Sequence, residues 1–152
     1  MSVIHELVVA TLGQKNAFEV EGNKVSYMER VNNNLIRVPV TITTAEKGFH
    51  LRAVVHKAVF SRVRASAGDY VLRLNKLIAG EALGAFQLDM VSGEYTYETT
   101  YRSWGLPSSK AICGVAEDAQ HQLCRFGNLL HASTLGVDAE ELAQKSIACL
   151  TL

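Results

Sequence analysis

Hydrophobic and polar residues alternate along several short segments in the first half of the chain. Apolar residues recur at alternate positions over 35–44 and again over 49–59. This period of two residues is typical of a strand with one buried face. Two shorter segments, 17–20 and 25–30, flank a Gly-Asn turn signal and predict a hairpin.

Two features modify the strand predicted at 35–44. Residues 32–34 before it are three asparagines, which tolerate the left-handed backbone of tight turns and predict a turn there. Pro39 lies inside the strand and has no N–H to donate to a ladder. We therefore expect this strand to lie at a sheet edge or to carry a bulge.

Helical periodicity dominates the second half of the chain. Apolar residues recur every three or four positions over 64–79, 108–130 and 138–150, as they do over 3–12. Residues 85–102 predict a second hairpin between two of these helices. Short turns join consecutive strands, so the strands must pair antiparallel. We expect an α+β fold in a single domain, with helices packed on a mainly antiparallel β-sheet.

The longest predicted helix, 108–130, keeps its apolar period for roughly six turns. Leu123 and Phe126 lie at the centre of the apolar stripe, so we expect them to be buried against the sheet. Leu129 and other apolar residues lie outside this stripe. The helix therefore carries more apolar surface than one sheet face needs. Trp104 follows the second hairpin and is expected to cover one end of the core.

Composition narrows the classes of protein that fit. The 152 residues include fifteen basic and fifteen acidic side chains, which argues against a nucleic-acid or anionic-membrane binder, although a local patch could survive the average. No apolar run approaches a membrane span, and the first residues lack the pattern of a signal peptide. Cys113, Cys124 and Cys149 form no Cys-x-x-Cys pair, so we expect reduced, core-filling thiols in a cytoplasmic protein.

Three short matches connect the chain to a known family. They are the segment 37–40 (Arg-Val-Pro-Val), Asn75, and the segment 84–89 (Gly-Ala-Phe-Gln-Leu-Asp). With the order of elements, these residues resemble the YbjN-like family of proposed bacterial sensory-transduction regulators. The resemblance covers about residues 1–135. It implies a fold like that of type III secretion chaperones, dimers included, with helix 138–150 as an addition to the shared core.

Two positions depart from the family pattern. Gln87 stands where an acidic residue is frequent, and Glu98 stands where an arginine is common. Both departures change the charge on the surface of the second hairpin. They put in doubt any partner contact that relatives make there.

Five residues are candidates for partner binding. Tyr95, Tyr97 and Tyr101 form an aromatic stripe on one face of a strand, where they fit either an interface or packing under a helix. Arg52 lies on a polar strand face that Arg37 could join from the neighbouring strand. A solvated polar face is the simpler interpretation of these arginines.

No catalytic, cofactor or metal motif is legible. His50 and His56 share the same polar strand face but lie six residues apart, roughly 20 Å in an extended strand, so they cannot bind one ion together. No nucleophile elbow, phosphate-binding glycine loop or Cys–His pair is present in the sequence.

These observations favour a non-enzymatic, chaperone-like adaptor that binds another polypeptide and forms a homodimer. The surplus apolar surface of helix 108–130 and an edge strand at 35–44 support this interpretation. A small-ligand-binding regulatory domain is the alternative, and a small enzyme comes third. An exposed apolar groove would favour the adaptor, whereas a closed apolar cavity with converging polar groups would favour the ligand-binding domain.

Overall fold

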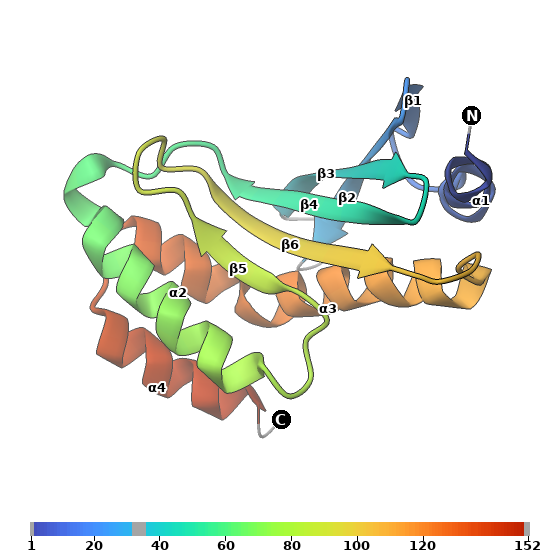
Figure 1. The fold of residues 1–152 in the computed structure, drawn as a ribbon. Coiled ribbons are helices and arrows are strands. Elements are labelled where there is room, and N and C mark those ends of the chain that lie inside the picture. Colours follow the sequence, from blue (N-terminus) through green and yellow to red (C-terminus); the bar gives the residue numbers. More distant parts are fainter. Residues whose placement is uncertain (1, 32–35, 151–152) are drawn as a thin grey trace.

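The fold is a single antiparallel sheet with helices on one side (Figure 1). A computed structural model describes residues 2–31 and 36–150. Over these residues it contains six strands in the order β1-β2-β3-β4-β6-β5, all paired antiparallel. The elements are α1 (Val3–Leu12), β1 (Glu19–Glu21), β2 (Lys24–Val31), β3 (Ile36–Ala45), β4 (Gly48–His56), a 3-10 turn (Ser61–Val63), α2 (Arg64–Ile78), β5 (Ala85–Leu88), β6 (Tyr95–Arg102), α3 (Ser109–Thr134) and α4 (Ala139–Leu150). The expected α+β class is confirmed.

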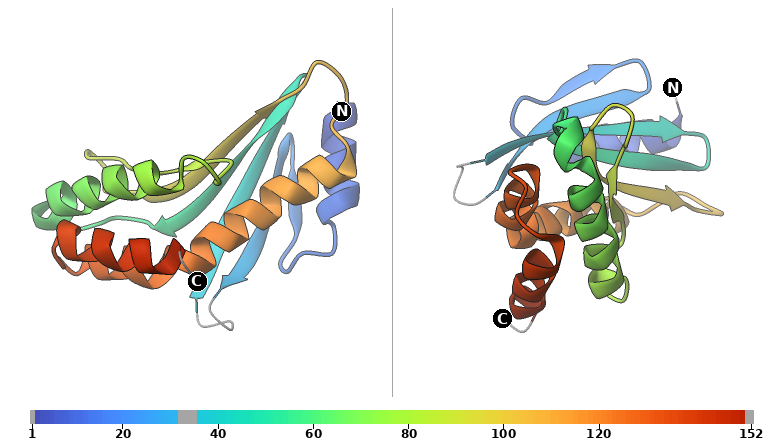
Figure 2. Two further views of the ribbon diagram at one scale, coloured as in Figure 1. Left: turned by 90° about the horizontal axis from the view of Figure 1, so that it is seen from below. Right: turned by 90° about the vertical axis from the view of Figure 1, so that its left-hand side faces the viewer.

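The helices cover one face of the sheet and leave the other open (Figure 2). The long helix α3 contacts β2, β4 and β6, and α2 contacts β5. α4 packs on α2 and α3, while α1 contacts α3 and β3. The apolar surface of α3 beyond its sheet-facing stripe is therefore met by neighbouring helices. Within the described residues, no helix lies on the opposite face.

The core lies between the sheet and α3. Strand residues alternate between buried and partly exposed, as the sequence pattern predicts; in β4, Leu51 and Ala53 are fully buried while Arg52 between them is not. Leu123 and Phe126 are buried, as expected, and Leu123 lines a small cavity together with Val38 of β3. α3 begins at the N-cap Ser108, whose hydroxyl accepts a hydrogen bond from the Ala111 amide.

Pro39 does not mark a sheet edge, so the first of the two alternatives expected for this strand is wrong. β3 lies between β2 and β4, and Pro39 stands opposite Met28 of β2. The Met28 amide donates to the carbonyl of Asn16, on the side away from β3. In an antiparallel pair, two opposed residues either point their backbone N–H and C=O groups at one another or both point them away. The Pro39 nitrogen therefore faces β4, whose ladder with β3 begins only at Val40.

Three other expectations need a correction or a limit. Trp104 is fully exposed and covers no part of the core, which corrects its expected role. Cys124 is exposed on α3, whereas Cys113 and Cys149 are half-buried, and all three thiols are unpaired. The turn expected at 32–34 lies outside the described residues.

Candidate functional site

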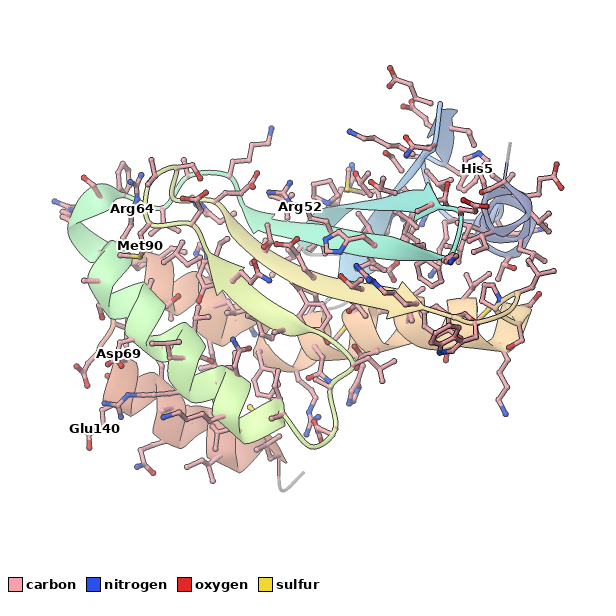
Figure 3. The ribbon with its side chains drawn as sticks, viewed as in Figure 1. His5, Arg52, Arg64, Asp69, Met90 and Glu140 are labelled. Atoms are coloured by element: carbon pink, nitrogen blue, oxygen red, sulfur yellow. The ribbon has the colours of Figure 1, made fainter. Side chains whose placement is uncertain are left out.

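An apolar groove runs between α2 and the edge strand β5. It has a volume of about 590 Å³. The residues that line it are Ala65, Gly68, Asp69, Val71, Leu72, Asn75, Phe86, Gln87, Leu88 and Met90. Figure 3 labels Asp69 and Met90 on the side of the molecule where α2 meets the second hairpin. The groove is thus formed by a helix and a strand together.

Apolar side chains stand exposed along this groove. Leu72 is 65% exposed and Met90 is 53% exposed, whereas Phe86 in the floor is buried. Gly68 lies directly beside Met90, since a Cβ at that position would be in ordinary van der Waals contact with the Met90 sulfur, at 3.5 Å. Val91 and Phe60, near the tip of the hairpin, are also largely exposed. Exposed apolar residues that gather on one part of a protein are a general mark of interaction surfaces.

The position of Met90 is fixed by an arginine at the start of α2. The Arg64 guanidinium donates to the carbonyls of Val59 at 2.7 Å, Met90 at 3.3 Å and Val91 at 2.9 Å. Asp89 accepts hydrogen bonds from the backbone amides of Val91 and Ser92. These amide hydrogen bonds hold the pKa of the Asp89 carboxyl below its usual value. The loop that carries Met90 is therefore well anchored to α2.

Asn75 closes the free edge of β5. Its side-chain amide donates to the Phe86 carbonyl at 2.8 Å, and its side-chain oxygen accepts from the Phe86 amide at 2.9 Å. Both backbone groups point away from β6 and would otherwise be open to a foreign strand. Asn75 thus fixes the distance between α2 and β5 and sets the width of the groove.

We expect the substitution Asn75→Ala to lower the free energy of unfolding by about 1–3 kcal/mol, because the Phe86 amide and carbonyl lose their partners. Urea denaturation measures the loss. Lys76→Ala on the exposed side of the same helix serves as the control and should change stability by less than about 0.5 kcal/mol. Equal stability of the two variants would contradict the role given to Asn75.

Tyr95 and Tyr97 belong to the core, which corrects their expected role as partner-binding residues. Both are 0% exposed because the face of β6 that carries the tyrosines is the one that α3 covers. The Tyr95 hydroxyl lies 3.2 Å from the Ser133 hydroxyl, and the Tyr97 hydroxyl donates to Asp118 at 2.5 Å. Burial raises the pKa of the Tyr97 hydroxyl, and the hydrogen bond to Asp118 adds to the effect. The hydroxyl groups of both buried tyrosines thus have hydrogen-bond partners on α3.

Tyr101 and the two arginines lie apart from one another. Tyr101 is half-buried near the end of β6 and stacks on Phe49 with ring centroids 5.1 Å apart. Arg52, on the open sheet face, pairs with Glu94. Arg37 lies opposite Arg30. It is four residues from Thr41, the β3 residue opposite Arg52, which is about 13 Å along a strand. The structure therefore does not bring Arg37 to Arg52.

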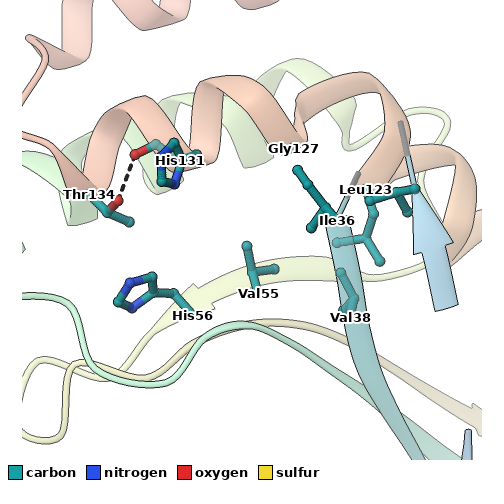
Figure 4. Close-up of a pocket in the computed structure, with 9 residues that line it drawn as sticks. Ile36, Val38, Val55, His56, Leu123, Gly127, His131 and Thr134 are labelled. Carbon is teal, nitrogen blue, oxygen red and sulfur yellow. Dashed lines mark hydrogen bonds between the residues drawn. The ribbon is translucent and has the colours of Figure 1, made fainter. Parts of the chain in front are cut away.

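A small cavity lies between the sheet and α3 (Figure 4). Val38 and Val55 form part of its apolar wall, and His56, His131 and Thr134 contribute polar groups. A register shift between Val54 and His56 turns His56 toward the helices, so it does not share the face of His50 and Arg52 as expected. The cavity holds about 110 Å³, whereas ligand sites usually begin at about 300 Å³.

The described residues contain no group of three or more His, Cys, Asp or Glu side chains placed to hold a metal ion. None of the helices they form is both long enough and apolar enough to cross a bilayer. No protein-family model matches the sequence, and no curated protein matches it at a significant level.

The groove residues were not among the candidates from the sequence. Leu72 lies off the buried stripe of α2, and Met90 falls in the turn between β5 and β6. An apolar residue that lies outside the buried stripe of its helix can be recognised in the sequence as a candidate for an exposed binding surface. The adjacency of α2 and β5, which joins Leu72 to Met90, is not written in the local sequence pattern.

Proposed function

We propose that this protein is a non-enzymatic, chaperone-like adaptor that binds an apolar segment of another polypeptide. The observation that carries the proposal is the exposed apolar groove between α2 and β5, with Leu72 and Met90 at its rim. Its volume of about 590 Å³ accommodates several side chains of a partner.

The chemistry of the groove suits a polypeptide ligand. Its walls are mainly apolar, and its polar groups are few and neutral apart from Asp69. Met90 has a flexible thioether side chain, which can adapt to different apolar partners. Helices that bind in such grooves insert side chains spaced three or four residues apart.

The edges of the sheet argue against binding by strand addition. Asn75 occupies the outward backbone groups of Phe86 on β5. The other edge strand, β1, is three residues long and carries Glu19 and Glu21. Charged, short edges discourage pairing with a foreign strand. The partner is therefore expected to bind through side chains in the groove.

A peptide-display selection on the wild-type protein tests this proposal. We expect amphipathic peptides whose affinity falls at least roughly thirtyfold in the double variant Leu72→Asp, Met90→Asp, because two apolar contacts are replaced by charge. Isothermal titration calorimetry measures the affinities.

The matched control is Ile147→Asp on α4, which alters an exposed apolar residue outside the groove. This variant should bind the selected peptides as the wild type does. Urea unfolding checks that all variants remain folded. Peptides that bind both aspartate variants equally, or a selection without amphipathic peptides, would contradict the proposal.

The small-ligand alternative rests on the cavity beside α3. Its apolar walls and its three polar groups match the expected pattern, but its volume of about 110 Å³ admits only a very small molecule. The groove is therefore the better-supported site.

Membership of the YbjN-like family, a cytoplasmic location and a homodimer belong to the same proposal. Unpaired cysteines support the location. The homodimer rests on the family resemblance, because β3 is an interior strand and the second stripe of α3 is packed against other helices. Sedimentation equilibrium at micromolar concentration tests it, and a single species near 16.6 kDa would contradict it.

A further inference from the structure

A second depression, of similar volume to the groove, lies at the far end of the sheet from the hairpin tip. It has a volume of about 570 Å³ and forms where the β3–β4 turn meets the end of β6. The residues that line it are Thr43, Ala45, Lys47, Gly48, Phe49, His50, Thr100, Tyr101, Arg102, Ser103 and Trp104. We refer to these residues as the Trp104 hollow. None of them lines the groove between α2 and β5.

Backbone contacts hold the two sides of the Trp104 hollow together. Gly48 stands opposite Arg102 in the β4–β6 ladder, and the Ser103 amide donates to the Lys47 carbonyl at 3.0 Å. A side chain on Gly48 would overlap the backbone of Tyr101. The close approach that glycine permits therefore places Lys47 beside Arg102, from segments more than fifty residues apart in sequence.

The hollow is rich in aromatic rings. Phe49 and Tyr101 are stacked with an interplanar angle of 17°. The Trp104 side chain is fully exposed to solvent. An indole that buries nothing in its own chain has both ring faces free for a planar ligand. Stacking on such side chains is how proteins hold nucleobases without reading their sequence.

The charge of the hollow is positive. Lys47 and Arg102 form no side-chain hydrogen bond or ion pair with any other residue that the structure describes. His50 is already engaged, since it lies 2.8 Å from Glu98 and 2.8 Å from the Thr100 hydroxyl. Glu98 does not line the hollow. Glu46, next to Lys47, lines a separate depression beside His5. Two cations without acidic partners are therefore available to an anion.

We propose that the Trp104 hollow binds the phosphate and base of a nucleotide. The base stacks on Trp104, and the phosphate lies between Lys47 and Arg102, whose guanidinium is suited to two parallel hydrogen bonds with phosphate oxygens. Hydroxyls of Thr43 and Ser103 are at hand for further hydrogen bonds. The volume lies within the range of about 300–1,000 Å³ that small-molecule sites occupy. This is a local positive site on a chain with no net charge.

The single tryptophan of the chain makes the proposal directly measurable. Trp104 fluorescence is recorded while the full-length protein is titrated with adenosine monophosphate, with a short oligothymidylate and with inorganic phosphate. We expect saturable quenching by the nucleotide or the oligonucleotide, and little change with phosphate alone, because phosphate offers no ring to stack.

Variants locate the site. Lys47→Ala and Arg102→Ala should each weaken nucleotide binding about tenfold, because each removes a cation from the phosphate. Arg37→Ala is the matched control, since Arg37 is an exposed arginine that does not line the hollow. It should bind nucleotides as the wild type does. Circular dichroism confirms that each variant is folded.

The same titrations distinguish the two possible ligands, a free nucleotide and a single-stranded nucleic acid. Much tighter binding of the oligonucleotide, with a steep loss of affinity in added salt, indicates single-stranded nucleic acid. Equal or tighter binding of the mononucleotide indicates a free nucleotide. Absence of saturable quenching by either probe at millimolar concentration would overturn the proposal. Equal affinity of the wild type and the two hollow variants would overturn it as well, and neither result bears on the groove.

Discussion

Replacing Phe126 with alanine should lower the free energy of unfolding by about 3–5 kcal/mol. Phe126 is 0% exposed and belongs to the buried stripe of α3. Its removal forfeits the transfer free energy of a phenyl ring and leaves a cavity between two rigid layers. The strands beneath are paired on both sides and cannot collapse into the space.

Urea denaturation followed by circular dichroism measures this loss. Cys124→Ala is the matched control, because Cys124 lies two residues away on the same helix and is exposed. Its effect should be within about 0.5 kcal/mol. A loss of less than about 1 kcal/mol for Phe126→Ala would mean that the sheet-facing side of α3 is wrongly assigned.

Tyr97→Ala should lower the free energy of unfolding by about 3–5 kcal/mol, as Phe126→Ala does. The Tyr97 ring is fully buried, and its centroid lies 4.8 Å from that of the Phe86 ring. Tyr97→Phe separates the ring from the hydroxyl. The hydroxyl donates to Asp118 and accepts from the Gly84 amide at 3.0 Å. Removing it should cost about 1–3 kcal/mol, because both partners lose a hydrogen bond in a partly buried site.

Thermal or urea unfolding of both variants decides the role of the tyrosine stripe. The prediction is a graded series in which the wild type is most stable, Tyr97→Phe is intermediate and Tyr97→Ala is least stable. A Tyr97→Ala variant of unchanged stability would return Tyr97 to the protein surface and would contradict the packing described above.

Local patterns were sufficient for most of the fold. Alternation over 35–44 and helical periodicity over 108–130 depend on neighbours in sequence, and both predicted elements are present with small shifts at their ends. The place of β3 in the sheet was not predictable from Pro39. A proline lacks one N–H donor, and an interior strand tolerates this where its hydrogen-bond ladder with a neighbouring strand ends. Here the β3–β4 ladder begins at Val40, which only the long-range register reveals.

The candidate site was harder to predict than the fold. A period of two places Tyr95, Tyr97 and Tyr101 on one strand face, but it does not say whether helices cover that face. The groove depends on Leu72 of α2 meeting Met90 beyond β5, and Asn75 and Arg64 create that meeting through side-chain contacts with backbone groups. Tertiary contacts of this kind have no periodic signature.

The central claim is that the groove between α2 and β5 receives an apolar segment of a partner. Backbone amide chemical shifts, measured by NMR with a peptide selected on the wild-type protein, test it most directly. We predict that the largest changes fall on Gly68, Leu72 and Met90, and that amides of the open sheet face such as Arg52 stay unchanged. Large changes confined to the open face, with the groove amides unmoved, would contradict the claim.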